Sequence, residues 1–262
     1  MSGFSIDVLD SFGYGDSLMH RIDPRAKVLA TFGFVVAVVS FNKYELSGLM
    51  PFFLLPMATV ALGFLPIRLV LNRVLAALPF IVLIGIFNPV FDRAPVMLWD
   101  GFQIRAGWIS FASILLRGIL CVSAAVTLIG TTSFPRFIAA LQALKVPDAL
   151  ATQLMLIYRY LFLLIGQARA TRRARSLRSA SDKTPLGLAS SMLVALLNRT
   201  LDLAQAVWMA MKARGFDTRL KVTRPMNWRP ADSFYLALVA AGSVLFRFWP
   251  LGEWLGRMIV TK

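Results

Sequence analysis

The chain has 262 residues, of which 58% are hydrophobic and only 16% are charged. An average soluble domain has about 45–50% apolar residues, so this composition argues against a soluble globular protein. A net charge of +15 suggests nucleic acid in a soluble chain, but here its distribution among apolar segments matters more than its sum. The single cysteine excludes an internal disulfide, and the single histidine excludes zinc-finger or haem-attachment spacings.

Several apolar segments approach or reach the roughly 17–25 residues that a membrane-spanning helix needs. We place spans near 26–41, 46–65, 74–91, 106–130 and 231–249. The first 20 residues contain three aspartates and lack the apolar core of a cleavable signal peptide. The sequence therefore predicts an all-α polytopic membrane protein with about five transmembrane helices.

The lysine and arginine residues are concentrated at 133–230, between the fourth and fifth spans. The positive-inside rule places this segment in the cytoplasm. Alternation then puts the amino terminus and the 66–73 loop inside, and the 42–45 loop, the 88–105 loop and the carboxyl terminus outside. One alternative stays open, because 150–166 is apolar enough to be a sixth span. The arginines that follow it would then lie outside, against the rule.

The cytoplasmic segment predicts three helices. Residues 134–145 are amphipathic, with Pro135 in the first turn, where a missing N–H costs little. Residues 148–179 contain no proline and one glycine, which predicts one helix of about 45 Å at 1.5 Å per residue. Residues 186–213 carry an apolar stripe along a third helix. The predicted domains are 1–132 with four spans, 133–230 with the cytoplasmic helices, and 231–262 with the last span and tail.

The two long cytoplasmic helices end in similar tripeptides, Ala174–Arg175–Ser176 and Ala213–Arg214–Gly215. Small neighbours let a partner surface approach the backbone, and a guanidinium offers a fixed fork of donors suited to carboxylates. A basic residue followed by glycine is also ordinary chemistry at the end of a helix, since it suits the dipole and the left-handed cap. Docking and capping therefore both remain possible for Arg214.

Arg175 belongs to a dense cluster formed by Arg169, Arg172, Arg173, Arg175 and Arg178. At about 100° per residue these charges surround most of the helix, whereas a helix on a membrane surface keeps one apolar face. The end of this helix has therefore left the membrane or is covered by a partner. We expect Arg175 to dock, and Arg172, Arg173 and Arg178 to face lipid phosphates or an acidic rim of the partner.

These features resemble the transmembrane T component of energy-coupling factor (ECF) transporters, the EcfT/CbiQ family of prokaryotic vitamin and metal importers. The stretch 20–27, with Asp23, Pro24, Arg25 and Lys27, is similar to the family's motif at the start of the first helix. The two tripeptides resemble the family's paired motifs, with serine where glycine would complete the first. The stretches 10–27 and 87–93 look most like the cobalt and nickel branch, the CbiQ type.

The resemblance implies a non-catalytic subunit of a bacterial inner-membrane importer for cobalt or nickel, with its helices at 133–230 acting as coupling helices. Two ATP-binding-cassette subunits would each receive one tripeptide, with Arg175 and Arg214 inserted into grooves. A substrate-binding membrane subunit would pack beside the chain in the bilayer, with or without a small accessory membrane subunit. ATP and Mg²⁺ would belong to the ATPases, and this chain would hold no cofactor. Movement of the tripeptides would tilt stiff helices that have two arrangements.

Other functions compete with this interpretation. A T component could serve a vitamin rather than a metal, because specificity would lie in a different chain. A self-contained permease typically has repeats and polar sites at the midplane, and an intramembrane enzyme needs clustered acids, a serine–lysine or histidine pair, or metal ligands. The apolar segments contain no histidine, no acid pair and no repeat. No recognisable fold supports nucleic-acid binding.

Individual polar residues carry further hypotheses. Asp202 is the only acidic residue within the long apolar helices, so we expect it to pair with Arg117, Arg159 or Arg199, because a buried arginine needs a partner. Alternatively, Arg159 extends its charged end to the interface. His20 lacks the company of acids or cysteines that a metal needs, and we expect it at a surface or interface.

Overall fold

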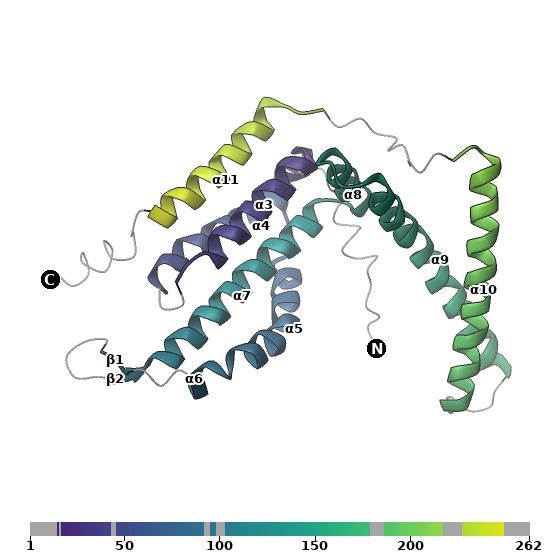
Figure 1. The fold of residues 1–262 in the computed structure, drawn as a ribbon, viewed down its shortest axis with the longest axis horizontal. Helices are drawn as coiled ribbons and strands as arrows, with labels where there is room; N and C mark the ends of the chain where they lie inside the picture. Colours follow the sequence, from purple (N-terminus) through teal and green to yellow (C-terminus); the bar gives the residue numbers. More distant parts are fainter. Residues whose placement is uncertain are drawn as a thin grey trace. The chain divides into compact units, whose positions relative to one another are not determined.

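The structure is a computed structural model that describes residues 15, 17–42, 46–91, 95–97, 103–178, 186–216 and 227–248. Its long elements are all α-helices (Figure 1), which confirms the all-α membrane class. The strands in the described ranges are β1 (Pro95–Met97) and β2 (Gln103–Arg105), which form a short antiparallel ribbon. The chain divides into a first unit, Met1–Ala140 with Pro225–Lys262, and a second unit, Leu141–Arg224. The domain boundaries at 133 and 230 stay a prediction.

The first unit begins with the short helix α2 (Leu18–Arg21) and with α3 (Pro24–Val39). Asp23 caps α3, since its side chain accepts a hydrogen bond of 2.9 Å from the Arg25 backbone N–H. Pro24 occupies the first helical position, where its missing N–H costs nothing. The expected span at 46–65 is split into the 3₁₀ helix η1 (Ser47–Phe53), which contains Pro51, and α4 (Leu54–Gly63).

The expected loop at 66–73 is wrong, because α5 (Ile67–Gly85) begins directly after Pro66 and includes both arginines of that segment. Arginine is a good helix former, so these basic residues extend the apolar helix instead of ending it. The short helix α6 (Asn88–Phe91) and the ribbon then lie in the segment that was expected to be an outer loop. The 42–45 loop lies mostly outside the described residues.

The remaining helices confirm the predicted ranges within about two residues, the usual uncertainty at helix ends. They are α7 (Ala106–Thr131), α8 (Phe134–Ala143), α9 (Asp148–Arg178), α10 (Leu186–Ala213) and α11 (Pro230–Phe248). After α8, Lys145 has a left-handed φ of 66°, and the Val146 N–H donates to the Leu141 carbonyl at 3.1 Å. This is a Schellman ending in which a lysine occupies the position that favours glycine.

By length and composition, three described helices can cross a membrane: α5, α7 (from Gly107) and α9. α3 has only 16 residues, and α11 has Asp232 and Arg247 in its first and last turns. The crossing of these two helices stays a prediction. Because α9 meets the criterion, the alternative that 150–166 crosses the membrane also stays open.

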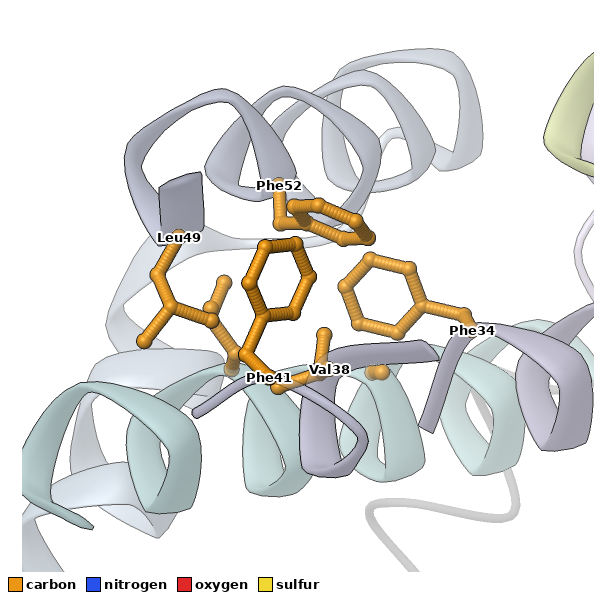
Figure 2. Close-up of a cluster of buried hydrophobic side chains, with 7 residues drawn as sticks. Phe34, Val38, Phe41, Leu49 and Phe52 are labelled. Carbon is orange, nitrogen blue, oxygen red and sulfur yellow. The ribbon is translucent and has the colours of Figure 1, made fainter. Parts of the chain in front are cut away.

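A cluster of buried hydrophobic side chains in the first unit joins α3, η1 and α7 (Figure 2). Its buried side chains are Phe34, Val38, Phe41, Leu49, Phe52, Leu120 and Ala124. The centre of the Phe52 ring lies 5.3 Å from the centre of the Phe41 ring, in an edge-on arrangement, and 5.7 Å from the centre of the Phe34 ring. Lipid tails are as apolar as this cluster, so close van der Waals packing, rather than transfer out of water, holds such helices together.

Candidate functional site

The first tripeptide lies near the end of α9, in the second unit. Ala174 and Ser176 are exposed, but Arg175 is half-buried. Its Nη1 atom lies 4.0 Å from the Met192 sulfur on α10. The Arg175 side chain therefore contacts α10 and is partly shielded from solvent.

Arg175 lines a groove of about 290 Å³ between α9 and α10. Arg172 lines it as well, three residues earlier on the same face of α9, and the α10 side contributes Met192, Leu193 and Leu196. The groove thus has an apolar floor and two guanidinium groups. Guanidinium forks bind carboxylates through two parallel hydrogen bonds, so this site suits a protein segment that carries both apolar and acidic side chains.

The second tripeptide follows α10 and has a different environment. Gly215 has a left-handed φ of 69°, its N–H donates to the Lys212 carbonyl at 3.0 Å, and the Phe216 N–H donates to the Met211 carbonyl at 3.0 Å. These bonds are those of a Schellman motif. The main chain and Gly215 thus cap α10 without the Arg214 side chain, which is exposed. Arg214 is available for docking.

The rest of the arginine cluster is exposed to solvent or lipid: Arg169, Arg172, Arg173 and Arg178. Leu177 is 82% exposed among them. The Ser176 hydroxyl donates to the Arg173 carbonyl at 2.9 Å, within the helix itself. A single exposed leucine is normal on a protein surface and does not by itself indicate a partner.

A second groove, of about 380 Å³, lies between α9 and α10 farther from the arginine cluster. Leu156, Tyr160 and Leu164 line it from α9, and Leu203, Val207 and Trp208 line it from α10. Trp208 is 55% exposed, and the Lys212 ammonium lies 5.2 Å from the centre of its ring. Aromatic side chains in exposed apolar patches are typical of binding surfaces.

The Asp202 carboxylate and the Arg159 guanidinium are both exposed. Within the described part of the second unit, no hydrogen bond or ion pair joins Asp202 to Arg159 or Arg199. The pairing of Asp202 stays a prediction. In the first unit, the Arg117 guanidinium donates a hydrogen bond to the Asn42 carbonyl.

His20 is buried, with only 6% of its surface exposed, and its Nδ1 atom lies 2.6 Å from the Ser17 hydroxyl. His20 therefore does not lie at the surface, and the expected alternative of an interface stays a prediction. Among the residues with described positions, no group of three histidine, cysteine, aspartate or glutamate residues is placed to hold a metal ion.

The amino-terminal motif is buried in the first unit, where Asp23, Pro24 and Lys27 are all buried and Arg25 is half-buried. The Lys27 ammonium donates to the Thr131 carbonyl at 2.9 Å. The Asp23 N–H donates to a carboxylate oxygen of Asp232 at 2.7 Å. Sequence reasoning missed Asp232. The available signal was its place, the third residue of a helix that begins with proline, where acidic side chains reach back to cap the helix.

Comparison with known proteins places the chain in a family. The family of cobalt transport proteins, CbiQ, matches residues 15–224. The energy-coupling factor transporter transmembrane protein EcfT of Limosilactobacillus fermentum is 29% identical over 254 residues, which cover 90% of this chain and 94% of that protein. EcfT of Streptococcus thermophilus is 26% identical over 266 residues, covering 91% and 97%. The cobalt transport protein CbiQ of Salmonella typhimurium is 33% identical over 133 residues, covering 46% and 59%.

These relatives are membrane components of transporters, and the chain is a membrane transport subunit of the same kind. Because the family match spans most of its length, the chain belongs to the CbiQ family of cobalt transport proteins, the transmembrane T components of energy-coupling factor transporters.

Proposed function

We propose that this subunit couples ATP hydrolysis to transport in an ECF-type importer. Two ATP-binding-cassette subunits, which hold ATP and Mg²⁺, dock at Arg175 and Arg214. Their movement tilts α9 and α10 and releases substrate from a separate substrate-binding membrane subunit. The chain itself performs no catalysis. The observation that carries the proposal is the pair of arginines in one compact unit, Arg175 near the end of α9 against the first turns of α10, and Arg214 directly after α10.

The spacing of the two arginines supports two docking partners. Arg175 lies against Met192 near the start of α10, and Arg214 follows its last residue. At 1.5 Å per residue these positions are about 33 Å apart along the helix, roughly the diameter of a small domain. One ATPase subunit would need an extended surface to reach both arginines, whereas two related subunits can each receive one.

The apolar groove at Trp208 supports a further contact with a membrane protein. Its apolar lining and exposed tryptophan fit a substrate-binding subunit that is itself embedded in lipid. The arginine groove suits an acidic, water-soluble partner instead, because its charged rim favours carboxylates. The two surfaces of the second unit therefore match the two kinds of partner that an ECF transporter needs.

We propose cobalt as the transported ion. The family description and the relative from Salmonella typhimurium both name cobalt transport. The relatives that match over most of their length are named EcfT, with no ion in the name, so a T component for another substrate is the second candidate. Uptake of radiolabelled Co²⁺ in cells that express the whole transporter, compared with cells that lack this chain, decides between them.

We also propose that the chain lies in the inner membrane of a bacterium, with its amino terminus and residues 133–230 in the cytoplasm and its carboxyl terminus outside. The excess of lysine and arginine at 133–230 supports this orientation. Reporter fusions after residues 145 and 262 test it. Cytoplasmic activity at 145 and external activity at 262 are the expected results, and the opposite pattern contradicts the orientation.

The docking test is co-purification of the chain with its ATPase subunits. Arg175→Glu and Arg214→Glu should each weaken association by roughly thirtyfold or more, because reversing a charge at a buried contact costs about 2–5 kcal/mol. Arg169→Glu is the matched control, since it makes the same charge change at an exposed position of the same helix. If the double variant binds the ATPases as wild type does, the arginines are not docking groups and the proposed mechanism is wrong.

A further inference from the structure

A set of buried polar contacts joins three parts of the first unit that are far apart in the sequence. They are the start of α3, the end of α7 and the start of α11. The contacts involve Asp23, Lys27, Thr131, Thr132 and Asp232, which we call the polar junction. Each of these residues is at most 5% exposed.

At the start of α11, the Asp232 carboxylate accepts two backbone hydrogen bonds with its two oxygens. One comes from the Arg229 N–H at 2.7 Å, which caps the helix that Asp232 belongs to. The other comes from the Asp23 N–H at 2.7 Å, across 209 residues of sequence. Hydrogen bonds to an ionised carboxylate are about twice as strong as neutral ones, so Asp232 fixes the start of α11 to the start of α3.

One turn into α3, the Lys27 ammonium reaches the end of α7. It donates to the Thr131 carbonyl at 2.9 Å and lies 3.5 Å from the Thr132 hydroxyl. The last carbonyls of a helix have no partner within it, and they favour a positive charge. Lys27 therefore satisfies the end of α7 and fixes that end to α3.

The charges within the junction depend on one another. Three of its five side chains, those of Asp23, Lys27 and Asp232, are ionisable and buried. Removing one partner from such a group leaves a buried charge or donor without compensation, which is far more costly than removing an exposed one. The junction is thus a cooperative unit, and a substitution in it loosens more than one connection.

The position of the junction in the chain gives it a role. The second unit, which contains both arginine tripeptides, is connected to the first along the chain at two crossings, after Ala140 and before Pro225. The first crossing lies in α8, the helix that follows α7, and the second precedes α11. The five-residue stretch from Asp23 to Lys27 contacts the end of α7 and the start of α11.

We propose that the polar junction holds the end of α7 and the start of α11 together on α3, so that movement of the second unit is delivered to α3, α7 and α11 as one displacement. Asp232 and Lys27 are its positioning residues. This inference rests on the proposed function, because it concerns how movement received from the ATPases reaches the membrane helices. Without the junction, each crossing would move on its own and part of the displacement would be lost.

The first experiment tests the contacts themselves and needs no partner. Hydrogen–deuterium exchange of the purified chain in detergent is measured at the Asp23 and Arg229 amides in wild type, Asp232→Asn and Ser233→Ala. Asparagine keeps the shape of Asp232 but offers one oxygen, so exchange at these amides should accelerate about tenfold or more, as for a locally opened bond. Ser233→Ala is the matched control, because it removes the bond from Trp228 Nε1 one residue later. Unchanged exchange in Asp232→Asn overturns the junction.

The second experiment measures coupling in the complete transporter, as Co²⁺ accumulated in vesicles per ATP hydrolysed. Lys27→Met and Asp232→Asn should lower this ratio about three- to tenfold, the range expected for residues that transmit coupling. Association with the ATPases and the rate of hydrolysis should stay near wild type. Lys145→Met, which removes an exposed lysine, should leave the ratio unchanged.

The outcomes separate the two proposals. If wild type neither binds ATPases nor hydrolyses ATP, the proposed function is wrong, and the exchange experiment alone judges the junction. If association, hydrolysis and transport fall in the same proportion in Lys27→Met, or if none of them changes, the positioning role is wrong. Lys27→Met keeps the aliphatic stem in place, so it serves as the test variant if Asp232→Asn does not accumulate.

Discussion

The two compact units differ in how many of their side chains are buried by contacts within the unit. The largest fully buried side chains of the described structure, among them Phe34, Phe52 and Asp232, all belong to the first unit. In the described part of the second unit, only Ala151 and Thr152 are buried. Apolar residues such as Leu193 and Trp208 are largely exposed there. Both units therefore present apolar surfaces that lipid or other subunits have to cover, as at Phe80 in the first unit, but the first unit also holds a core organised by its own contacts.

Substitutions in the aromatic cluster should show this difference most strongly. Phe52→Ala should lower the free energy of unfolding by about 3–5 kcal/mol, because it leaves a cavity between three packed elements. Trp208→Ala, at an exposed position of α10, should change it by less than about 1 kcal/mol but weaken assembly with the other subunits. Chemical unfolding in detergent and co-purification measure the two effects. Equal losses of stability would remove the distinction between the units.

Two aspartates, one in each unit, should differ in how much they contribute to stability. Asp232→Ala should cost about 2–3 kcal/mol, because a buried backbone N–H at Asp23 and a part-buried one at Arg229 lose their acceptor. Asp202→Ala should cost at most about 0.5 kcal/mol in the isolated chain, since its carboxylate is exposed. Thermal unfolding of both variants checks this. Loss of transport in Asp202→Ala at normal expression would support the predicted pairing of Asp202, and unchanged transport would argue against it.

Substitutions at the two left-handed helix ends should change the free energy of unfolding in opposite directions, because one removes a glycine and the other introduces one. Gly215→Ala should destabilise by about 1–2 kcal/mol, because a side chain is disfavoured at a φ of 69°. Lys145→Gly should stabilise by up to about 1 kcal/mol, since glycine removes the same penalty after α8. Unfolding midpoints of the two variants give both values. A loss of stability in Lys145→Gly would mean that the lysine side chain makes a contact worth more than the backbone penalty.

Ionic strength should also affect the two units differently, with a smaller effect than the substitutions above. Raising ionic strength from 0.1 to 1 M shortens the screening length from about 10 to about 3 Å. Association of the ATPases through exposed arginines such as Arg214 should then weaken several-fold. The stability of the first unit should hardly change, because buried contacts such as that between Lys27 and Thr131 are screened much less. Binding and unfolding curves at both salt concentrations test this, and salt-independent association would argue against docking by charge.

Much of the helical architecture follows from local sequence. The absence of proline in α9, the Asp23–Pro24 cap of α3 and the glycine after α10 each act within a few residues, so the sequence is sufficient to place these elements. The Asp-Pro-Arg motif and the tripeptides were likewise visible as patterns of adjacent residues. The early start of α5 does not follow from such a pattern, because arginines occur in the loops between spans and also favour helix.

Composition and neighbouring residues along the chain are sufficient to predict the class of this protein, its long helices and the arginines at the ends of α9 and α10. The contacts between distant segments depend on the tertiary fold. Only the folded chain brings the Asp232 carboxylate to the Asp23 backbone and the Arg175 guanidinium to the Met192 sulfur. Such contacts depend on how helices pack against one another, which satisfies buried polar groups from distant segments. A pattern of adjacent residues carries no information about which distant group will supply the partner.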